Sequence, residues 1–116
     1  MRSQDAERLK VPLILSEFGA CTGSEACAKE VNSVVDACED HLTSWMYWQY
    51  KGFGDFTTTG SLTEGMYDGE GKLFDRKLNA ILRSYSPAYQ GTPTMMKNTE
   101  DGSFTTSFKY NKSVEA

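Results

Sequence analysis

The sequence has no long apolar run and no surplus of basic residues. None of its stretches approaches the ~20 consecutive apolar residues that a membrane-spanning helix needs, and the opening MRSQDAERLK lacks the apolar centre of a signal peptide. Its 12 Lys and Arg are outnumbered by 16 Asp and Glu, and they form no basic stripe. Because phosphate backbones are bound through clustered positive charge, the composition argues against a nucleic-acid partner.

Histidine and cysteine are scarce, which bears on metal sites and disulfides. There is one histidine, and the cysteines at 21, 27 and 38 are spaced by six and eleven residues, unlike the paired Cys-x-x-Cys ligands of zinc sites. We therefore expect no metal site. Cys27 and Cys38 lie on the apolar stripe of an expected helix, where free cysteine packs as a small hydrophobe. Cys21 lies in the loop before that helix, so a Cys21–Cys27 bridge and three free thiols both remain open.

Proline is also rare, and the 3 present, together with glycine, mark the ends of the expected elements. Residues 3–10 are expected to be the polar end of a helix. VPLILS, at 11–16, is a short continuous apolar run, typical of a fully buried parallel strand. Ser24 is a suitable N-cap, and apolar residues at helical spacing predict an amphipathic helix to about residue 42. The aromatic run TSWMYWQYKGFG, at 43–54, predicts a second strand.

A strand, a helix and a second strand with short connections form a parallel crossover unit, which predicts an α/β fold. After a loop at 55–72, a second amphipathic helix is expected at about 73–85, and the segment from 92 onwards predicts a hairpin around Glu100-Asp101-Gly102. Two parallel strands leave unpaired edges, and an isolated hairpin is marginally stable. We therefore expect the chain to be part of a larger protein. The inner face of the second helix is assigned to Leu73, Leu78, Ile81, Leu82 and Tyr85.

Glu17 is the main candidate for chemistry. Active sites of parallel α/β folds gather at the carboxyl ends of strands, where PLILSEFGA, at 12–20, presents this carboxylate. Gly19 allows the chain to bend away without placing a side chain in the site. The alternative is that Glu17 is a capping or ion-pairing acid at the end of a strand.

Aromatic residues on the next strand suit a sugar ligand. The C–H face of a pyranose stacks on indole rings, and its hydroxyl groups need polar partners. Because side chains alternate along a strand, we expect Trp45 mainly to pack and Trp48 to face the site, although both remain binding candidates. The polar partners expected at the edge of the sugar are Gln49, Tyr50 and Lys51.

Several segments together resemble a known enzyme family. PLILSEFGA, the helix after it, SWMYWQYKGF and LFDRKLNAILRSYSPAYQGTP are similar to the last two β/α units of clan-A glycoside hydrolases of family 5, and more narrowly of its endoglycoceramidases. The similarity covers about residues 8–93. It implies that residues 1–91 are the C-terminal portion of a (β/α)₈ TIM barrel. The segment TMMKNTEDGSFTTSFKY resembles the entry into a C-terminal β-sandwich, so 92–116 would begin a second domain.

The resemblance also implies a mechanism. Glu17 would be the nucleophile of a retaining hydrolase that cuts glycosphingolipids between saccharide and ceramide, without a cofactor. Trp48 would be the platform under the sugar, with Tyr50, Lys51 and Trp45 as further substrate contacts. In this family the general acid is a glutamate preceded by asparagine, and no Asn-Glu pair occurs in the sequence. We therefore expect the 116 residues alone to be inactive and poorly folded.

Two other functions and a cellular location follow from the same residues. The first alternative is a related family 5 enzyme acting on β-glucans or steryl glucosides, and the second is a non-catalytic carbohydrate-binding chain. A lipid substrate implies contact with a membrane surface, for which Phe53 and Phe56 are candidates unless they pin their loop. The sequon Asn111-Lys112-Ser113 and oxidisable cysteines favour a secreted or lysosomal protein.

Overall fold

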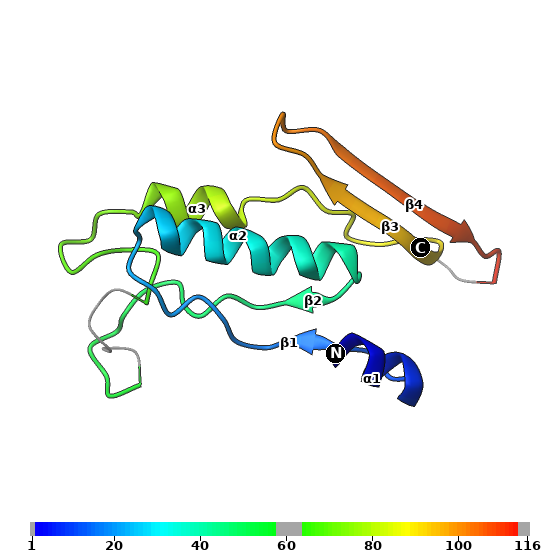
Figure 1. The fold of residues 1–116 in the computed structure, drawn as a ribbon, viewed down its shortest axis with the longest axis horizontal. Coiled ribbons are helices and arrows are strands. Elements are labelled where there is room, and N and C mark those ends of the chain that lie inside the picture. The colour runs from blue at the N-terminus through cyan, green and yellow to red at the C-terminus, as the bar shows by residue number, and fades with distance from the viewer. Residues whose placement is uncertain (1, 58–63, 114–116) are drawn as a thin grey trace.

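A long helix packed over two short parallel strands forms the centre of the molecule (Figure 1). The computed structural model describes residues 2–57 and 64–113. The elements are, in chain order, α1 (Arg2–Leu9), β1 (Ile14–Leu15), α2 (Glu25–Asp40), β2 (Ser44–Trp45), α3 (Asp75–Ile81), β3 (Gly91–Asn98) and β4 (Phe104–Tyr110).

Helix α2 agrees closely with its sequence pattern. The Ser24 side chain accepts a hydrogen bond of 3.2 Å from the backbone nitrogen of Cys27, which satisfies one of the free donors of the first turn. Glu25 lies in that first turn, where a negative charge is favourable. The predicted N-cap and amphipathic helix are therefore confirmed. The apolar residues that α2 buries are Cys27, Val31, Val35 and Cys38.

The parallel pairing of the two strands is also confirmed, but their burial is not. Ile14 pairs with Ser44 and Leu15 with Trp45, with α2 as the crossover. The expectation of a fully buried strand is wrong, since 53% of Ile14 is exposed. In Figure 1, α2 and α3 both lie on one side of the strands. Within the described residues, one face of the pair is thus covered and the other is not.

Helix α3 is shorter than the predicted helix at 73–85. It ends at Ile81 because Leu82 takes an extended conformation, with φ −70° and ψ 102°. The inner face assigned from sequence is therefore wrong at its C-terminal end, where Leu82 and Tyr85 are exposed. Lys77 and Ala80 are the residues that α3 buries.

The C-terminal segment forms the predicted hairpin. Strands β3 and β4 pair antiparallel, from Gly91 opposite Tyr110 to Asn98 opposite Phe104. The buried carboxylate of Glu39, on α2, accepts hydrogen bonds from the backbone nitrogen of Asn98 at 3.2 Å and from its Nδ2 at 2.8 Å. This contact holds the hairpin against α2. The proposed division into two domains at residues 91 and 92 stays a prediction.

The barrel likewise stays a prediction. Residues 2–57 and 64–113 form two separate two-stranded sheets. None of the helices in these residues has the length and apolar character needed to cross a membrane.

Candidate active site

Glu17 lies just beyond β1, where the pairing with the second strand becomes irregular. The backbone nitrogen of Met46 donates to the Leu15 carbonyl at 2.9 Å, and that of Trp48 donates to the Phe18 carbonyl at 2.8 Å. Successive bonds thus advance three residues on the first strand and two on the second, whereas a regular parallel ladder advances both equally. One extra residue is accommodated on the strand that carries Glu17, as in a β-bulge.

Phe18, which lies at this irregularity, packs between two aromatic side chains. The Phe18 ring lies edge-on between Trp45 and Tyr47, with its centroid 5.6 Å from each of theirs. Phe18 and Tyr47 pack against the core cluster of Cys27, Val31 and Ala80. Glu17, the residue before Phe18, lies outside this packed cluster. Its side chain is exposed.

Gly19 makes a sharp turn directly after this segment. Its φ of +111° is one that residues with a side chain rarely adopt, and a β-carbon there would overlap Cε2 of Tyr47. The Tyr47 hydroxyl is 3.1 Å from the Gly19 carbonyl and donates to it. The expected turn at Gly19 is confirmed, and its closest neighbour is the Tyr47 ring.

The two tryptophans lie three residues apart on the same segment, and both are half-buried. Trp45 lies against Phe18 on the side that the helices cover, which favours a packing role for it. Trp48 lies farther along the same segment, is half-buried, and is joined to the Glu17 segment through the Phe18 carbonyl. The peptide bond between Trp48 and Gln49 is cis. Glu17 and Trp48 therefore lie on adjacent, hydrogen-bonded segments at the carboxyl ends of the two strands.

Tyr50 and Lys51 lie slightly farther along and line a cavity. Tyr50 is 62% exposed, and its hydroxyl is 3.3 Å from that of Tyr67, with the two rings edge to face. Both residues, with Lys51 and Asp68, line a cavity of about 510 Å³ whose lining does not include Glu17 or Trp48. The candidate substrate-binding residues therefore do not share one cavity. Tyr50 and Lys51 line this cavity, and Trp48 does not. Gln49, the third polar candidate, is buried.

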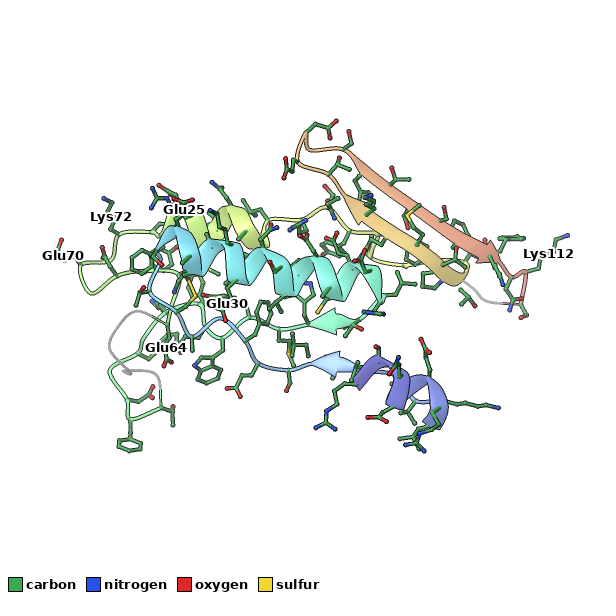
Figure 2. All side chains as sticks on the ribbon, viewed as in Figure 1. Glu25, Glu30, Glu64, Glu70, Lys72 and Lys112 are labelled. Atoms are coloured by element: carbon green, nitrogen blue, oxygen red, sulfur yellow. A yellow bond between two sulfur atoms is a disulfide. The ribbon has the colours of Figure 1, made fainter. Side chains whose placement is uncertain are left out.

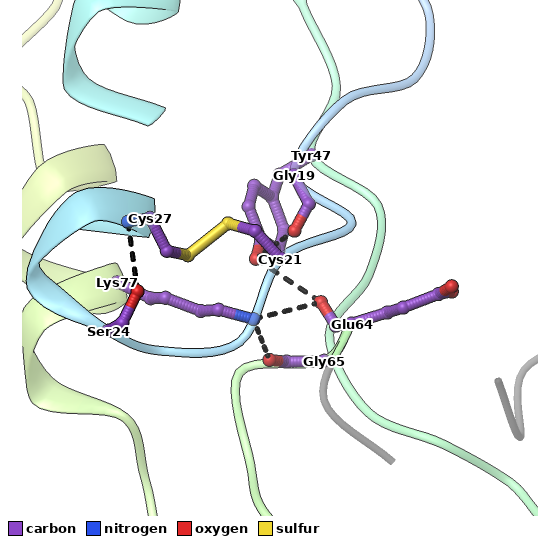
Figure 3. The surroundings of a disulfide bond; sticks show 8 residues. All are labelled: Gly19, Cys21, Ser24, Cys27, Tyr47, Glu64, Gly65 and Lys77. Atoms are coloured by element: carbon purple, nitrogen blue, oxygen red, sulfur yellow. Dashed lines mark hydrogen bonds between the residues drawn. A yellow bond between two sulfur atoms is a disulfide. The ribbon is translucent and has the colours of Figure 1, made fainter. Parts of the chain in front are cut away.

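A buried lysine is the part of the site that the sequence pattern did not indicate (Figure 3). Lys77 is 0% exposed, and its Nζ donates to the carbonyls of Gly65 at 3.0 Å and Glu64 at 3.4 Å. Burial lowers the pKa of the Lys77 ammonium, while the charge of the Glu64 carboxylate opposes that shift. Leu73, Lys77 and Ala80 have the i, i+4, i+7 spacing of one helix face, and this spacing is the sequence signal that could have indicated a buried Lys77. A lysine in an amphipathic pattern is, however, normally assigned to the solvent-exposed face.

Tyr47 connects this lysine to the Glu17 segment. Its hydroxyl lies 3.2 Å from the Glu64 carbonyl as well as close to that of Gly19. Burial raises the pKa of Tyr47 to about 12, so the phenol keeps its proton and acts as a donor near neutral pH. The segment at 64–66 is thereby fixed to the turn that follows Glu17. Within the loop expected at 55–72, Gly65 and Met66 are buried.

A disulfide closes the loop between the Glu17 turn and α2. Cys21 and Cys27 are joined with an S–S distance of 2.09 Å, whereas Cys38 is buried and free. Of the two states left open by the sequence, the bridge is the one present. In the described part of the chain, no group of three His, Cys, Asp or Glu residues is arranged to hold a metal ion.

Comparison with known proteins gives one informative relative. The chain is 33% identical over 92 residues to an endoglycoceramidase from Cyanea nozakii. The match covers 78% of this chain and spans 18% of the relative's length. No protein-family model and no solved structure matches the chain. The chain is thus similar to part of an endoglycoceramidase, which agrees with the resemblance found in the sequence and favours a glycosidase.

Proposed function

We propose that this chain supplies the nucleophile and the sugar platform of a retaining family 5 glycoside hydrolase that cuts glycosphingolipids between saccharide and ceramide. One observation carries the proposal: Glu17 and Trp48 lie on adjacent segments at the carboxyl ends of two parallel strands, joined by the Trp48 to Phe18 hydrogen bond. The similarity to an endoglycoceramidase supports the choice of substrate.

In this mechanism the Glu17 carboxylate attacks the anomeric carbon and forms a covalent glycosyl-enzyme. A second carboxylic acid, about 5 Å away, protonates the leaving oxygen and later activates the water that releases the sugar. The two groups need opposite protonation states near neutral pH. Because the sequence has no Asn-Glu pair, the general acid comes from outside these residues, and the chain alone is inactive. The mechanism needs no metal or organic cofactor.

The aromatic residues provide the substrate contacts. The Trp48 indole stacks on the C–H face of the sugar that is cut. The cavity lined by Tyr50, Lys51, Tyr67 and Asp68 offers hydroxyl, ammonium and carboxylate groups to further sugar units. Phe53 and Phe56 lie on the same loop, and both are exposed, Phe56 fully at 101%. Their position suits contact with the ceramide or with a membrane surface rather than pinning of the loop.

The barrel belongs to the same proposal. A groove between β1 and α2, lined mainly by apolar residues such as Ile14, Leu15 and Val34, has a volume of about 790 Å³. A preceding β/α unit would fill this groove and cover the exposed Ile14. Residues 1–91 are then the last part of the barrel, and 92–116 begin a β-sandwich. A secreted or lysosomal location suits a glycosphingolipid substrate.

The decisive experiment uses the complete protein that contains this chain, with ganglioside and a fluorescent glucosylceramide as substrates. Glu17→Gln should reduce hydrolysis by several orders of magnitude while leaving substrate binding intact. Glu30→Gln, at an exposed acid of α2, is the matched control and should keep full activity. Hydrolysis of cello-oligosaccharide in place of ganglioside would instead identify a β-glucan enzyme.

A non-catalytic carbohydrate-binding chain is the second candidate. The exposed Tyr50 and Tyr67 pair, which lies in a cavity separate from Glu17, is the observation that favours it. This candidate predicts glycan binding in a complete protein that hydrolyses none of these substrates. Detectable turnover that disappears in Glu17→Gln would exclude it.

A further inference from the structure

The sequence Asn111-Lys112-Ser113 directly follows β4 and is exposed at all three positions. It has the Asn-x-Ser pattern that oligosaccharyl transfer requires, with a residue other than proline in the middle. The other asparagines of the described chain, at positions 32, 79 and 98, are not followed by Ser or Thr two residues later. The pattern therefore selects a single acceptor.

The local geometry leaves the acceptor atom of Asn111 available. The backbone nitrogen of Asn111 donates to the Gln90 carbonyl at 3.0 Å, which fixes the end of the hairpin. Its Oδ1 accepts from the backbone nitrogen of Ser113 at 3.0 Å and from the Ser113 hydroxyl at 2.8 Å. Within residues 2–57 and 64–113, Nδ2 of Asn111 has no hydrogen-bond partner. The atom to which a glycan attaches thus belongs to an exposed residue and is unengaged within the described part of the chain.

The sequon is also far from the residues around Glu17. Figure 2 shows Lys112, the middle residue of the sequon, at one end of the molecule and Glu64 and Glu70 at the other. The backbone of Glu64 is held by Tyr47, which also binds the turn after Glu17. The long dimension of the molecule is 50 Å. A glycan at Asn111 therefore has space and does not cover the carboxyl ends of β1 and β2.

The disulfide is a second, independent observation that points to the same compartment. Cys21 and Cys27 are oxidised in the structure, and such bonds persist in the lumen of the secretory pathway and outside the cell. Oligosaccharyl transfer takes place in that same lumen. The two features lie in different parts of the fold and do not depend on each other.

We infer that Asn111 carries an N-linked glycan. The donor is an oligosaccharide attached through a diphosphate to a membrane lipid. Nδ2 of Asn111 forms a bond to C1 of the first sugar and loses one proton, while the bond from C1 to the diphosphate oxygen breaks. The lipid diphosphate leaves with the electron pair. This inference does not depend on the role of Glu17.

The test is site mapping on the natural protein, isolated from cells that make it. Cleavage after Glu100 and Glu115 releases a peptide that contains Asn111. Removal of the glycan enzymatically in heavy-oxygen water should convert Asn111 into labelled aspartate, with no label at the asparagines of positions 32, 79 and 98. A natural peptide that is entirely unmodified at Asn111 would overturn the inference.

Variants expressed in secretory cells give the matched controls. Asn111→Gln, Ser113→Ala and Lys112→Pro should each abolish the shift in electrophoretic mobility that enzymatic deglycosylation produces. Ser113→Thr and Lys112→Arg should retain it. All these positions are exposed, so the substitutions should leave the packed core undisturbed. A shift that survives Asn111→Gln would place the glycan elsewhere and also contradict the inference.

Discussion

The Tyr47 hydroxyl donates to the Gly19 carbonyl at 3.1 Å, and the ring of the same tyrosine occupies the space where a β-carbon at Gly19 would lie. The two residues are distant in the sequence, but together they fix the turn that follows Glu17. The turn after the candidate nucleophile is therefore held by a tyrosine of the segment that follows β2.

We predict that Gly19→Ala destabilises the chain by about 2–3 kcal/mol, because the new β-carbon meets the Tyr47 ring and the backbone has a positive φ. Gly71→Ala is the matched control, since Gly71 also has a positive φ of +81° but no atom within 4 Å of the place that a β-carbon would take. It should cost only about 1 kcal/mol. Urea denaturation measures both, and equal losses would show that the contact with Tyr47 is unimportant.

Because of Tyr47, the free energy of unfolding should depend on pH in the alkaline range. Its pKa is raised by burial from 10.0 to about 12, so between these values the unfolded chain has released a proton that the folded chain still holds. Its contribution to stability is therefore complete below pH 10 and is lost as pH rises towards 12. Thermal melts across this range should show a steeper decline in the wild type than in Tyr47→Phe. Parallel pH profiles would contradict the prediction.

Removal of the Lys77 ammonium should leave the carbonyl of the buried Gly65 without this donor, whereas the Glu64 carbonyl still accepts from Tyr47. We predict that Lys77→Met lowers the free energy of unfolding by about 1–3 kcal/mol, since Gly65 and Glu64 both accept hydrogen bonds from Nζ. Lys72→Met, at an exposed lysine of the preceding loop, should change stability by less than about 0.5 kcal/mol. Amide hydrogen exchange would locate the effect: faster exchange at Met66 is expected in Lys77→Met alone.

The Cys21–Cys27 disulfide should contribute measurably to the free energy of unfolding. For a closed loop of this short length, loss of the cross-link is expected to cost about 2 kcal/mol. Cys21→Ser should therefore lower the denaturation midpoint and make it insensitive to reductant. Cys38→Ala lacks the free thiol but keeps the bridge, so its midpoint should still fall when reductant is added. A wild-type midpoint that reductant leaves unchanged would be inconsistent with this role.

The sequence predicted those features whose causes are local. Ser24 caps α2 because a hydroxyl at that position satisfies a free backbone donor, and the apolar spacing from Cys27 to Cys38 specifies the face that α2 buries. The hairpin around Asp101 follows from turn chemistry in the same way. The parallel pairing of β1 and β2 followed from the order of the elements.

The features that the sequence did not predict depend on contacts between distant segments. Lys77 is buried because carbonyls of the segment at 64–65 meet it, and no pattern within α3 indicates those partners. The pairing of Cys21 with Cys27 could not be separated from free thiols by spacing alone. Leu82 and Tyr85 continue the helical pattern although the backbone turns extended at Leu82.

The extra residue between Leu15 and Phe18 makes the length of this short segment a constraint in its own right. If one residue were deleted there, a single residue would remain between Leu15 and Phe18, regular pairing would resume, and the bulge at Glu17 would be lost. Homologous chains should therefore tolerate substitution at Ser16 far better than insertion or deletion at the same point.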